Sequence, residues 1–421
     1  MAKKIAIIGS GISGLTCAHL LQHKHTICVF EANDYIGGHT ATKEVQVDGK
    51  DYAIDTGFIV FNDWTYPNFI KLITKLGVPY QASEMSFSVK NQPQNLEYNG
   101  NTLNSLFAQR RNIFRPLFWR IVLDILRFNK LCKNQDEKAL QNSQQTLFEF
   151  LQTHHFSDDF IHNYILPMCA AIWSTSLEKI KSFPFDFFLR FFKNHGLLNI
   201  TDRPQWYTIK GGSREYIAPL IAGFADKIKL NCPVKSVAHV YQHKIVTLHD
   251  GSEHQFDEVI FACHSDQALA MLAQPTQSQQ DILAKLPYAS NKVVLHKDQQ
   301  ILPKRKLAWA SWNYQILGYS GESQAPVALT YNMNILQNIQ ADTTFCVSLN
   351  NEEDIRADQI IGKYHYSHPQ FSQQSMLAQA RRQEISGVDG LHFCGAYWYN
   401  GFHEDGVRSA LDVCAHFGES L

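Results

Sequence analysis

The sequence predicts an α/β fold with a doubly wound, mostly parallel sheet, joined to a second α+β domain. Three observations lead to this prediction. An apolar run at residues 5–8 leads directly into a glycine-rich turn and a helical stretch, and a second strand-length run follows at residues 26–30. Residues 391–417 again show a strand, a glycine and a helix in that order. At 421 residues the chain is too long for one simple core, so two domains are expected.

The turn after the first strand carries three glycines at spacings that suit a bound dinucleotide. Gly9 permits a tight turn, Gly11 lets the main chain approach a pyrophosphate, and Gly14 lets the helix pack closely on the strand. The free N–H groups of the first helical turn would face the phosphates. The residues expected to contact the dinucleotide here are Gly9, Ser10, Gly11, Ile12, Ser13 and Gly14.

The strand at residues 26–30 ends on an acid, Glu31. Its carboxylate can accept hydrogen bonds from an adenosine ribose, and its charge would repel a 2′-phosphate. A glycine turn without a ligand is the alternative interpretation. Strand, glycine turn, helix, strand and acid nevertheless occur in the order that a dinucleotide needs, so a dinucleotide site is predicted.

Composition excludes several classes of protein. Apolar residues make up 45% and charged residues 18% of the chain, as in folded soluble proteins, and the net charge of −1 gives no basis for nucleic-acid binding. The nine cysteines form no CxxC pair, so we expect reduced thiols and a cytoplasmic location. No apolar run is long enough to span a membrane. No histidine spacing suits a metal, because neighbouring His154 and His155 cannot converge on one ion, so no metal site is expected.

A second glycine pair follows the acid, in the stretch Gly37-Gly38-His39-Thr40. Such a pair is expected where the chain passes beneath a longer dinucleotide. Here the sequence resembles the FAD-binding proteins of the flavin amine oxidase superfamily, which also holds phytoene-desaturase-like enzymes. His39 stands where the family usually has arginine, which leaves main-chain contacts but removes a cation near the phosphates. The resemblance implies FAD as cofactor, with contacts from Glu31, Ala32, Gly37, Gly38, His39 and Thr40.

Further motifs of the family follow along the chain. Residues 51–62 match a strand that ends in a D-x-G turn, and the resemblance implies that this turn lies near the flavin ring; an ordinary turn is the alternative for Asp55. Residues 206–216 resemble a glycine pair before a helix, which Ser213 is expected to cap. His264 is either catalytic or an ordinary loop histidine. The cofactor contacts implied by these motifs are Thr56, Gly57, Phe58, Val234 and Cys263.

The last motif resembles the family's closing loop and helix. The start of this helix would point N–H groups at flavin N1 and O2, where a reduced flavin gains negative charge, so the helix dipole favours reduction. Ala396 replaces the family's usual acid, which limits that position to main-chain contact. The expected cofactor residues here are Gly395, Ala396, Glu404, Asp405, Gly406 and Val407.

Three residues are candidates for catalysis. Phe402 falls where amine-oxidising members place one wall of an aromatic cage, although no paired cage residue is evident, and His403 follows it. Lys292 sits where many relatives carry a lysine that holds a water beside flavin N5. An exposed strand lysine is the alternative for Lys292.

The segment at residues 78–203 departs from the dinucleotide pattern. A helix is expected over residues 110–128, either as a core helix with solvated arginines or as a basic amphipathic helix on an anionic membrane surface. Six phenylalanines lie within Phe183–Phe192 and form either a domain core or a greasy substrate channel. Lys133–Gln145 is polar and predicts a loop. We assign residues 1–77, 204–265 and 386–421 to a Rossmann-like FAD-binding domain, and residues 78–203 and 266–385 to the substrate domain.

A narrower resemblance bears on the substrate. The GGHT turn, Trp309–Tyr314 (WASWNY) and the GFHEDG motif resemble a bacterial subgroup of predicted NAD/FAD-binding proteins, often encoded beside cyclopropane-fatty-acyl-phospholipid-synthase-like methyltransferases. This implies an FAD-dependent oxidoreductase that removes a hydride from an apolar substrate such as a modified fatty acyl chain. It also implies a lipid methyltransferase partner and peripheral contact with the inner membrane surface. An amine oxidase that releases hydrogen peroxide and a non-catalytic flavoprotein partner of the methyltransferase remain alternatives.

Overall fold

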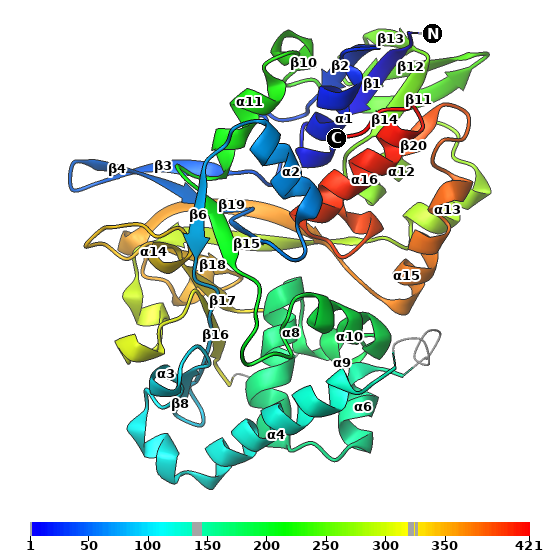
Figure 1. Cartoon of the computed structure of the whole chain (residues 1–421). Helices are drawn as coiled ribbons and strands as arrows, with labels where there is room; N and C mark the ends of the chain where they lie inside the picture. Colours follow the sequence, from blue (N-terminus) through cyan, green and yellow to red (C-terminus); the bar gives the residue numbers. More distant parts are fainter. Residues whose placement is uncertain (1, 137–144, 319–323, 325–326) are drawn as a thin grey trace.

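The α/β prediction is confirmed by the computed structural model, which describes residues 2–136, 145–318, 324 and 327–421. Figure 1 shows a parallel sheet with its helices at one end of the molecule and a layer of helices at the other. Two long strands, β15 (Tyr288–His296) and β19 (Ile360–Pro369), cross the middle between them. The second sheet, to which β15 and β19 belong, therefore lies between the parallel sheet and the helical layer.

The parallel sheet has the strand order β10-β2-β1-β14-β20. The side chains of each strand alternate between two hydrophobic cores, because successive side chains of a strand point to opposite faces of the sheet. Ile5 and Ile7 pack with the helices α1 (Ile12–Leu21) and α16 (His403–Ala415), whereas Ala6 and Ile8 pack towards the β11–β13 layer. The strands are β1 (Lys4–Ile8), β2 (Thr26–Phe30), β10 (Ile228–Lys229), β14 (Glu258–Phe261) and β20 (Leu391–Phe393).

The second sheet has seven strands in the order β19-β15-β18-β17-β16-β7-β8 and is antiparallel except for the β16–β7 pair. Its strands come from two distant parts of the chain, which agrees with grouping residues 78–203 and 266–385, although the exact domain limits stay a prediction. The remaining strands of this sheet are β7 (Phe87–Asn91), β8 (Leu96–Asn99), β16 (Trp312–Ile316), β17 (Leu329–Asn332) and β18 (Cys346–Leu349).

The remaining strands of the described chain form three smaller sheets. One of them, in the order β5-β9-β6, links the two expected domains, since β6 lies just beyond residue 77 yet pairs with β9. The strands of the smaller sheets are β3 (Thr42–Val47), β4 (Lys50–Asp55), β5 (Val60–Asn62), β6 (Tyr80–Ser83), β9 (Trp206–Ile209), β11 (Val234–Val240), β12 (His243–Leu248) and β13 (Glu253–Phe256).

The helical layer is built around phenylalanines. All six phenylalanines of Phe183–Phe192 are buried and form a core, which was the first of the two interpretations of this cluster; Phe191 also lines the cavity. Residues 137–144 of the expected loop lie outside the described residues. The helices of this layer are α3 (Leu103–Leu106), α4 (Pro116–Lys133), α6 (Leu147–Thr153), α7 (Asp158–Phe160), α8 (Leu166–Trp173), α9 (Leu177–Lys181) and α10 (Phe185–Asn194).

The other helices cover the two sheets. In the described part of the chain, no helix has both the length and the apolar character needed to cross a bilayer. All nine cysteines are unpaired thiols. The remaining helices are α2 (Pro67–Lys75), α11 (Ile217–Ile221), α12 (Ser265–Met271), α13 (Gln277–Leu283), α14 (Met333–Leu336) and α15 (Gln373–Ala380).

Candidate active site

A single cavity of about 1380 Å³ runs from the turn after β1 to the helical layer. Ligand pockets usually hold roughly 300–1,000 Å³, so this one has room for a long cofactor and a second molecule. One end is lined by the glycine turns, the middle by histidines and aromatic rings, and the far end by aliphatic side chains of α4 and α8. We call the two extremes the glycine end and the apolar end.

The three glycines of the first turn meet different surroundings. Gly9 has a φ of +107°, and a Cβ there would lie 2.7 Å from the Ala262 carbonyl oxygen, so this tight turn excludes a side chain. A Cβ on Gly14 would lie 2.0 Å from the carbonyl oxygen of Gly9, so the helix packs directly on the turn. A Cβ on Gly11 would meet nothing within 4 Å, although Gly11 lines the cavity. Open space therefore lies beside Gly11, at the N-terminus of α1.

Glu31 is buried at the end of β2 and lines the glycine end. One carboxylate oxygen accepts bonds from the Ser10 N–H at 2.8 Å and the Ser10 hydroxyl at 2.6 Å, and the other accepts from the Asn33 N–H at 2.9 Å. Glu31 therefore fixes the glycine turn. The Asn33 side-chain amide also donates to this second oxygen at 2.9 Å, so the protein fills the roughly four acceptor sites of the carboxylate, and a ribose would have to share them or displace one of these donors.

The second glycine pair packs against the first turn. The Gly37 N–H donates to the Ser10 carbonyl at 3.0 Å. Gly38 has a φ of +58°, and a Cβ there would approach the Gly11 Cα to 3.2 Å. The chain after the acid thus lies directly beside the phosphate-facing turn, as the resemblance implied.

The cavity brings together most of the residues expected from the sequence. Those that line it are Gly9, Ser10, Gly11, Ile12, Ser13, Glu31, Ala32, Gly37, Gly38, His39, Gly57, Phe58, Val234, Cys263, Gly395, Ala396, Phe402, His403 and Gly406. These positions come from eight separate stretches of sequence. Their convergence on one space is the main structural feature of the site.

Several expected contact residues lie one layer behind the lining. Gly14 packs beneath the turn, and Val407 is fully buried in the core. The Thr40 hydroxyl bonds the Tyr216 hydroxyl, and the Thr56 hydroxyl donates to the Ala41 carbonyl at 3.0 Å. These side chains support the walls of the cavity and do not reach into it.

The acids that open α16 also serve the fold. The Glu404 carboxylate accepts bonds from the Phe69 N–H at 2.8 Å and from Asn68, and so caps the N-terminus of α2. The Asp405 carboxylate accepts from the Phe402 N–H at 2.9 Å and caps its own helix, and burial raises the pKa of Asp405 to about 7. Neither residue is among those that line the cavity, so their side chains serve as caps, and the expected contact of the main-chain N–H groups with the flavin stays a prediction.

Two other expectations are corrected. Lys292 lies exposed on β15 and is absent from the cavity lining, because the strand turns its neighbours Asn291 and Val293 inward instead. Ser213 does not cap a helix; its hydroxyl donates to an Asp55 carboxylate oxygen at 2.8 Å. Burial raises the pKa of Asp55 to about 6.

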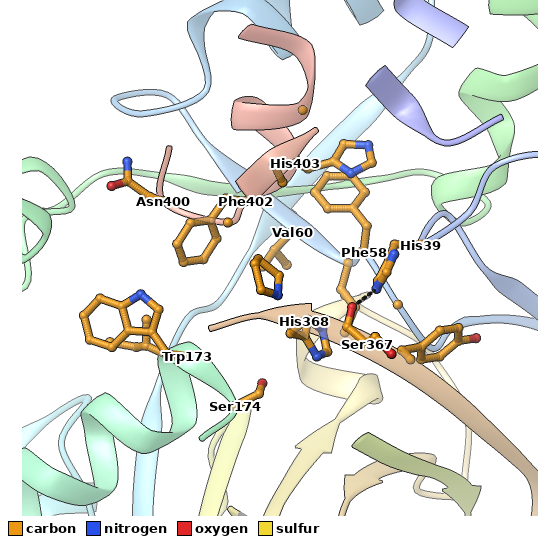
Figure 2. Close-up of a pocket in the computed structure, with 18 of the residues that line it drawn as sticks. His39, Phe58, Val60, Trp173, Ser174, Ser367, His368, Asn400, Phe402 and His403 are labelled. Carbon is orange, nitrogen blue, oxygen red and sulfur yellow. Dashed lines mark hydrogen bonds between the residues drawn. The ribbon is translucent and has the colours of Figure 1, made fainter. Parts of the chain in front are cut away.

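Histidines gather in the middle of the cavity (Figure 2). The ring of His39 lies 5.5 Å from that of His368 and 6.2 Å from that of His264. Burial lowers the pKa of His264 to about 4 and that of His368 and His403 to about 3. These imidazoles are therefore neutral at neutral pH, and the middle of the cavity carries no positive charge from them.

Hydrogen bonds set which ring nitrogens carry protons. The Asn291 amide donates to Nδ1 of His368 at 3.0 Å, and the Asn291 carbonyl oxygen accepts from Asn350 at 2.8 Å, which fixes the amide orientation. The proton of His368 therefore lies on Nε2. Nε2 of His39 donates to the Ser367 carbonyl at 3.0 Å. No sequence motif marks His368 as a site residue, because only the pairing of β19 with β15 brings that strand to the site.

Aromatic rings form two groups around the histidines. The His403 ring stacks on Phe58 with 3.7 Å between centroids, and its Nε2 lies 2.9 Å from the Tyr216 hydroxyl. Phe402 stacks on Phe191 at 5.3 Å, and Phe191 lies 4.8 Å from the Trp173 ring. Phe402 and Trp173 stand on the same side of the close-up (Figure 2). Helices α8 and α10 thus supply the aromatic partners of Phe402 that were not evident in the sequence.

The apolar end opens at the molecular surface. Three residues that line the cavity are also exposed to solvent: Leu103 (78%), Leu126 (45%) and Ile200 (64%). They therefore form the rim of its mouth. Among the described lining residues Glu31 is the only carboxylate, and it lies at the opposite end. In the described ranges no group of three His, Cys, Asp or Glu side chains could hold a metal ion.

Fold and site together define a dinucleotide-binding α/β protein whose cavity extends from the dinucleotide turn to an apolar end. The chain belongs to the family described as flavin containing amine oxidoreductase, whose model matches residues 12–331. It is accordingly an FAD-dependent oxidoreductase. The glycine end fits this cofactor, because the space beside Gly11, the N-terminus of α1 and Glu31 meet there.

Known proteins similar to this chain differ in their activities. A stretch of 92 residues is 36% identical to a 15-cis-phytoene desaturase from Synechococcus elongatus, covering 21% of this chain and 19% of that protein. The cyclohexylamine oxidase of Brevibacterium oxydans has a TM-score of 0.70 at 14% identity, covering 99% of this chain and 98% of that one. A CLA-producing fatty acid isomerase from P. acnes has a TM-score of 0.68 at 13% identity with the same coverage. The two structural likenesses establish the fold alone.

Proposed function

We propose that this flavoenzyme removes a hydride from an apolar carbon, and that its substrate is a fatty acyl chain that it dehydrogenates. One observation carries the proposal. The cavity continues from the glycine end into a tunnel of aliphatic side chains that opens at the surface. The aliphatic residues of this tunnel are Leu106, Val122, Ile125, Leu126, Met168, Ile172 and Leu197.

The charge of the lining argues against an alkylamine substrate. Such amines are protonated at neutral pH, as lysine is with a pKa of about 10.4, and a buried ammonium without a partner is strongly disfavoured. The described lining offers no carboxylate outside the glycine end. The tunnel therefore favours an uncharged chain, and it suits the kind of ligand named in the similar fatty acid isomerase.

The histidines and aromatic rings serve this reaction by position and proton affinity. Bound FAD supplies two-electron chemistry and accepts a hydride. Phe402, Phe191 and Trp173 hold an acyl chain by apolar contact where the tunnel meets the middle of the cavity. His403 is held flat by Phe58, and its pKa of about 3 makes it a weak base, so it takes the proton of the neighbouring carbon only once loss of the hydride has made that proton acidic.

The test is reduction of the FAD-loaded protein without oxygen. Saturated and monounsaturated free fatty acids and phospholipids are mixed with it anaerobically, and the visible absorbance of the flavin is followed while products are examined by mass spectrometry. We expect bleaching together with an acyl product two hydrogens lighter. Bleaching by amines alone would make the protein an amine oxidase. Bound FAD that no acyl compound bleaches would leave the non-catalytic partner of a lipid methyltransferase as the better account.

A further inference from the structure

Exposed apolar side chains gather beside the mouth of the cavity. Of the fifteen large hydrophobic residues exposed in the described chain, six lie within residues 103–126, which is far more than an even spread would give. The Trp119 indole N–H donates to the Ile113 carbonyl at 2.8 Å, which joins the turn before α4 to the helix. We call this surface the α4 face; its apolar residues are Leu103, Ile113, Phe114, Trp119, Leu123 and Leu126.

Helix α4 carries two apolar stripes, although a helix that only covers a core needs one. Phe118, Ile121, Phe128 and Cys132 are buried in the protein. Trp119, Leu123, Leu126, Lys130 and Lys133 follow one another at steps of four and three residues, so they share a second, solvent-facing stripe that ends in two lysines. Burial in the protein does not explain this second stripe.

The α4 face is basic. Residues 103–133 contain seven arginines and lysines but one acid, Asp124. Asp124 pairs with Arg127 at 3.0 Å, and Arg120 pairs with Asp159 at 2.7 Å. Arg110, Arg111 and Arg115 donate instead to main-chain carbonyls of neighbouring loops, and no carboxylate of the described chain pairs with them. Their charges therefore remain available to an external anion.

The apolar surface is continuous with the cavity. Leu103 and Leu126 belong to the α4 face and also line the mouth, and Ile200 completes the rim. On the same turns of α4, the neighbouring residues Val122 and Ile125 also line the cavity. An apolar chain can thus pass from the α4 face into the cavity along aliphatic side chains.

We propose that the α4 face docks on an anionic phospholipid bilayer and opens the cavity mouth towards its acyl region. Phe114, Trp119 and Leu123 insert at the level of the headgroups, while Arg110, Arg111 and Arg115 contact lipid phosphates. The combination of apolar insertion, uncompensated positive charge and an apolar passage selects a membrane over a protein partner. Entry of the substrate through this mouth rests on the proposed function, whereas docking itself does not.

Binding of the FAD-loaded full chain to vesicles tests the proposal. Vesicles of phosphatidylcholine alone are compared with vesicles that also contain phosphatidylglycerol, and bound protein is measured by co-sedimentation at low and high salt. We expect binding to the anionic vesicles and its loss at high salt, because screening weakens contacts between charges at a surface. Protein that stays in the supernatant with both kinds of vesicle would overturn the proposal.

Two double variants separate the apolar and charged contributions. F114E/L123E and R110Q/R111Q should each weaken binding to anionic vesicles by about tenfold or more, while flavin absorbance and melting temperature stay unchanged. The matched control is Leu377→Glu on α15, where an equally exposed leucine lies outside the α4 face and the cavity lining, and its binding should equal that of the unaltered chain.

Two outcomes would contradict membrane docking specifically. Binding that survives in F114E/L123E and R110Q/R111Q would remove the α4 face from the contact. If F114E/L123E instead converted a dimer to a monomer without lipid, a second copy of the chain would cover this face. None of these measurements needs turnover, so vesicle binding can succeed when acyl compounds fail to bleach the flavin, and the two proposals fail separately.

Discussion

The two ends of the cavity are built in different ways. At the glycine end, a few consecutive residues set the shape: Gly9, Gly11 and Gly14 decide where the main chain turns, where it is open and where it is closed. At the apolar end, no short stretch sets the shape, because α4, α8 and the loop around Ile200 each contribute single side chains. Cofactor recognition is therefore local in sequence, and substrate selection is distributed.

The largest expected effects distinguish two glycines of one turn. Gly14→Val places side-chain atoms against the Gly9 carbonyl, where even a Cβ would lie at 2.0 Å. The free energy of unfolding of the FAD-free chain should therefore fall by about 3 kcal/mol or more. A Cβ at Gly11 would meet no atom within 4 Å, so the free energy of unfolding of Gly11→Val should change by less than about 1 kcal/mol. Urea unfolding of both FAD-free variants measures this difference.

The same two variants test whether the FAD pyrophosphate occupies the open space beside Gly11. Gly11→Val should fold but bind FAD at least about tenfold more weakly, since a side chain keeps the pyrophosphate from the main chain. Titration with FAD followed by fluorescence checks this. If Gly11→Val bound FAD as tightly as the unaltered chain, the cofactor would not approach the turn there.

A variant of the apolar end should show the reverse pattern. Val122 lines the tunnel on α4, and Val122→Trp would fill it. We expect acyl-dependent reduction of the flavin to slow by about tenfold or more, because single-group changes in a hydrophobic pocket alter selection by that order, while FAD affinity is unchanged. Stopped-flow reduction and FAD titration of one preparation measure both. Weaker FAD binding would mean that the two ends are not separable.

Between the two ends, buried titratable groups make stability depend on pH. In five histidines burial lowers the pKa to about 4 or below, so each is neutral when folded near neutral pH but binds a proton near pH 6.5 once unfolded. Their stabilisation is present above about pH 6.5 and is lost as the pH falls towards their folded values. The folded pKa is about 4 or about 3 for each of His195, His264, His296, His368 and His403.

Two buried acids oppose the histidines. The pKa of Asp55 is raised to about 6 and that of Asp405 to about 7, so both are protonated when folded and release a proton on unfolding between their ordinary and raised values. Histidines with a lowered pKa outnumber acids with a raised pKa, which also include Glu404, so unfolding near pH 5 should take up protons and the melting temperature should fall as the pH falls. His368→Gln should reduce this slope by about one proton and Asp405→Asn should increase it by about one. A melting temperature that rises on acidification below about pH 6 would contradict the balance.

The same contrast explains how far the sequence could be interpreted. Strand β2 spans the expected residues 26–30, and α1 follows the glycine turn as expected, because glycine turns and apolar runs act within a few residues. Trp173 and His368 could not be assigned to the site, since each reaches it only through packing of distant segments, whereas Phe191 belonged to a cluster for which a substrate channel was one of two interpretations. Glu404 and Asp405 were assigned to the cofactor because a motif gives positions along the chain, whereas capping bonds turn their side chains away from the cavity.

The smallest expected effect is that of Lys292→Met. A family motif suggested that Lys292 lies beside the flavin, but its position on the strand points its side chain to solvent. Lys292 is exposed on β15, and its main-chain N–H donates to Asn350 at 3.0 Å. Lys292→Met should therefore change the rate of flavin reduction by less than about twofold. His403→Phe is the matched comparison, because it keeps a ring on Phe58 but loses the contact with the Tyr216 hydroxyl, and the loss of one proton acceptor should slow reduction by about a hundredfold. Anaerobic reduction rates with one acyl substrate compare the two. If Lys292→Met were the slower variant, β15 would have to present its other face to the flavin, and the assignment of the histidines would fall with it.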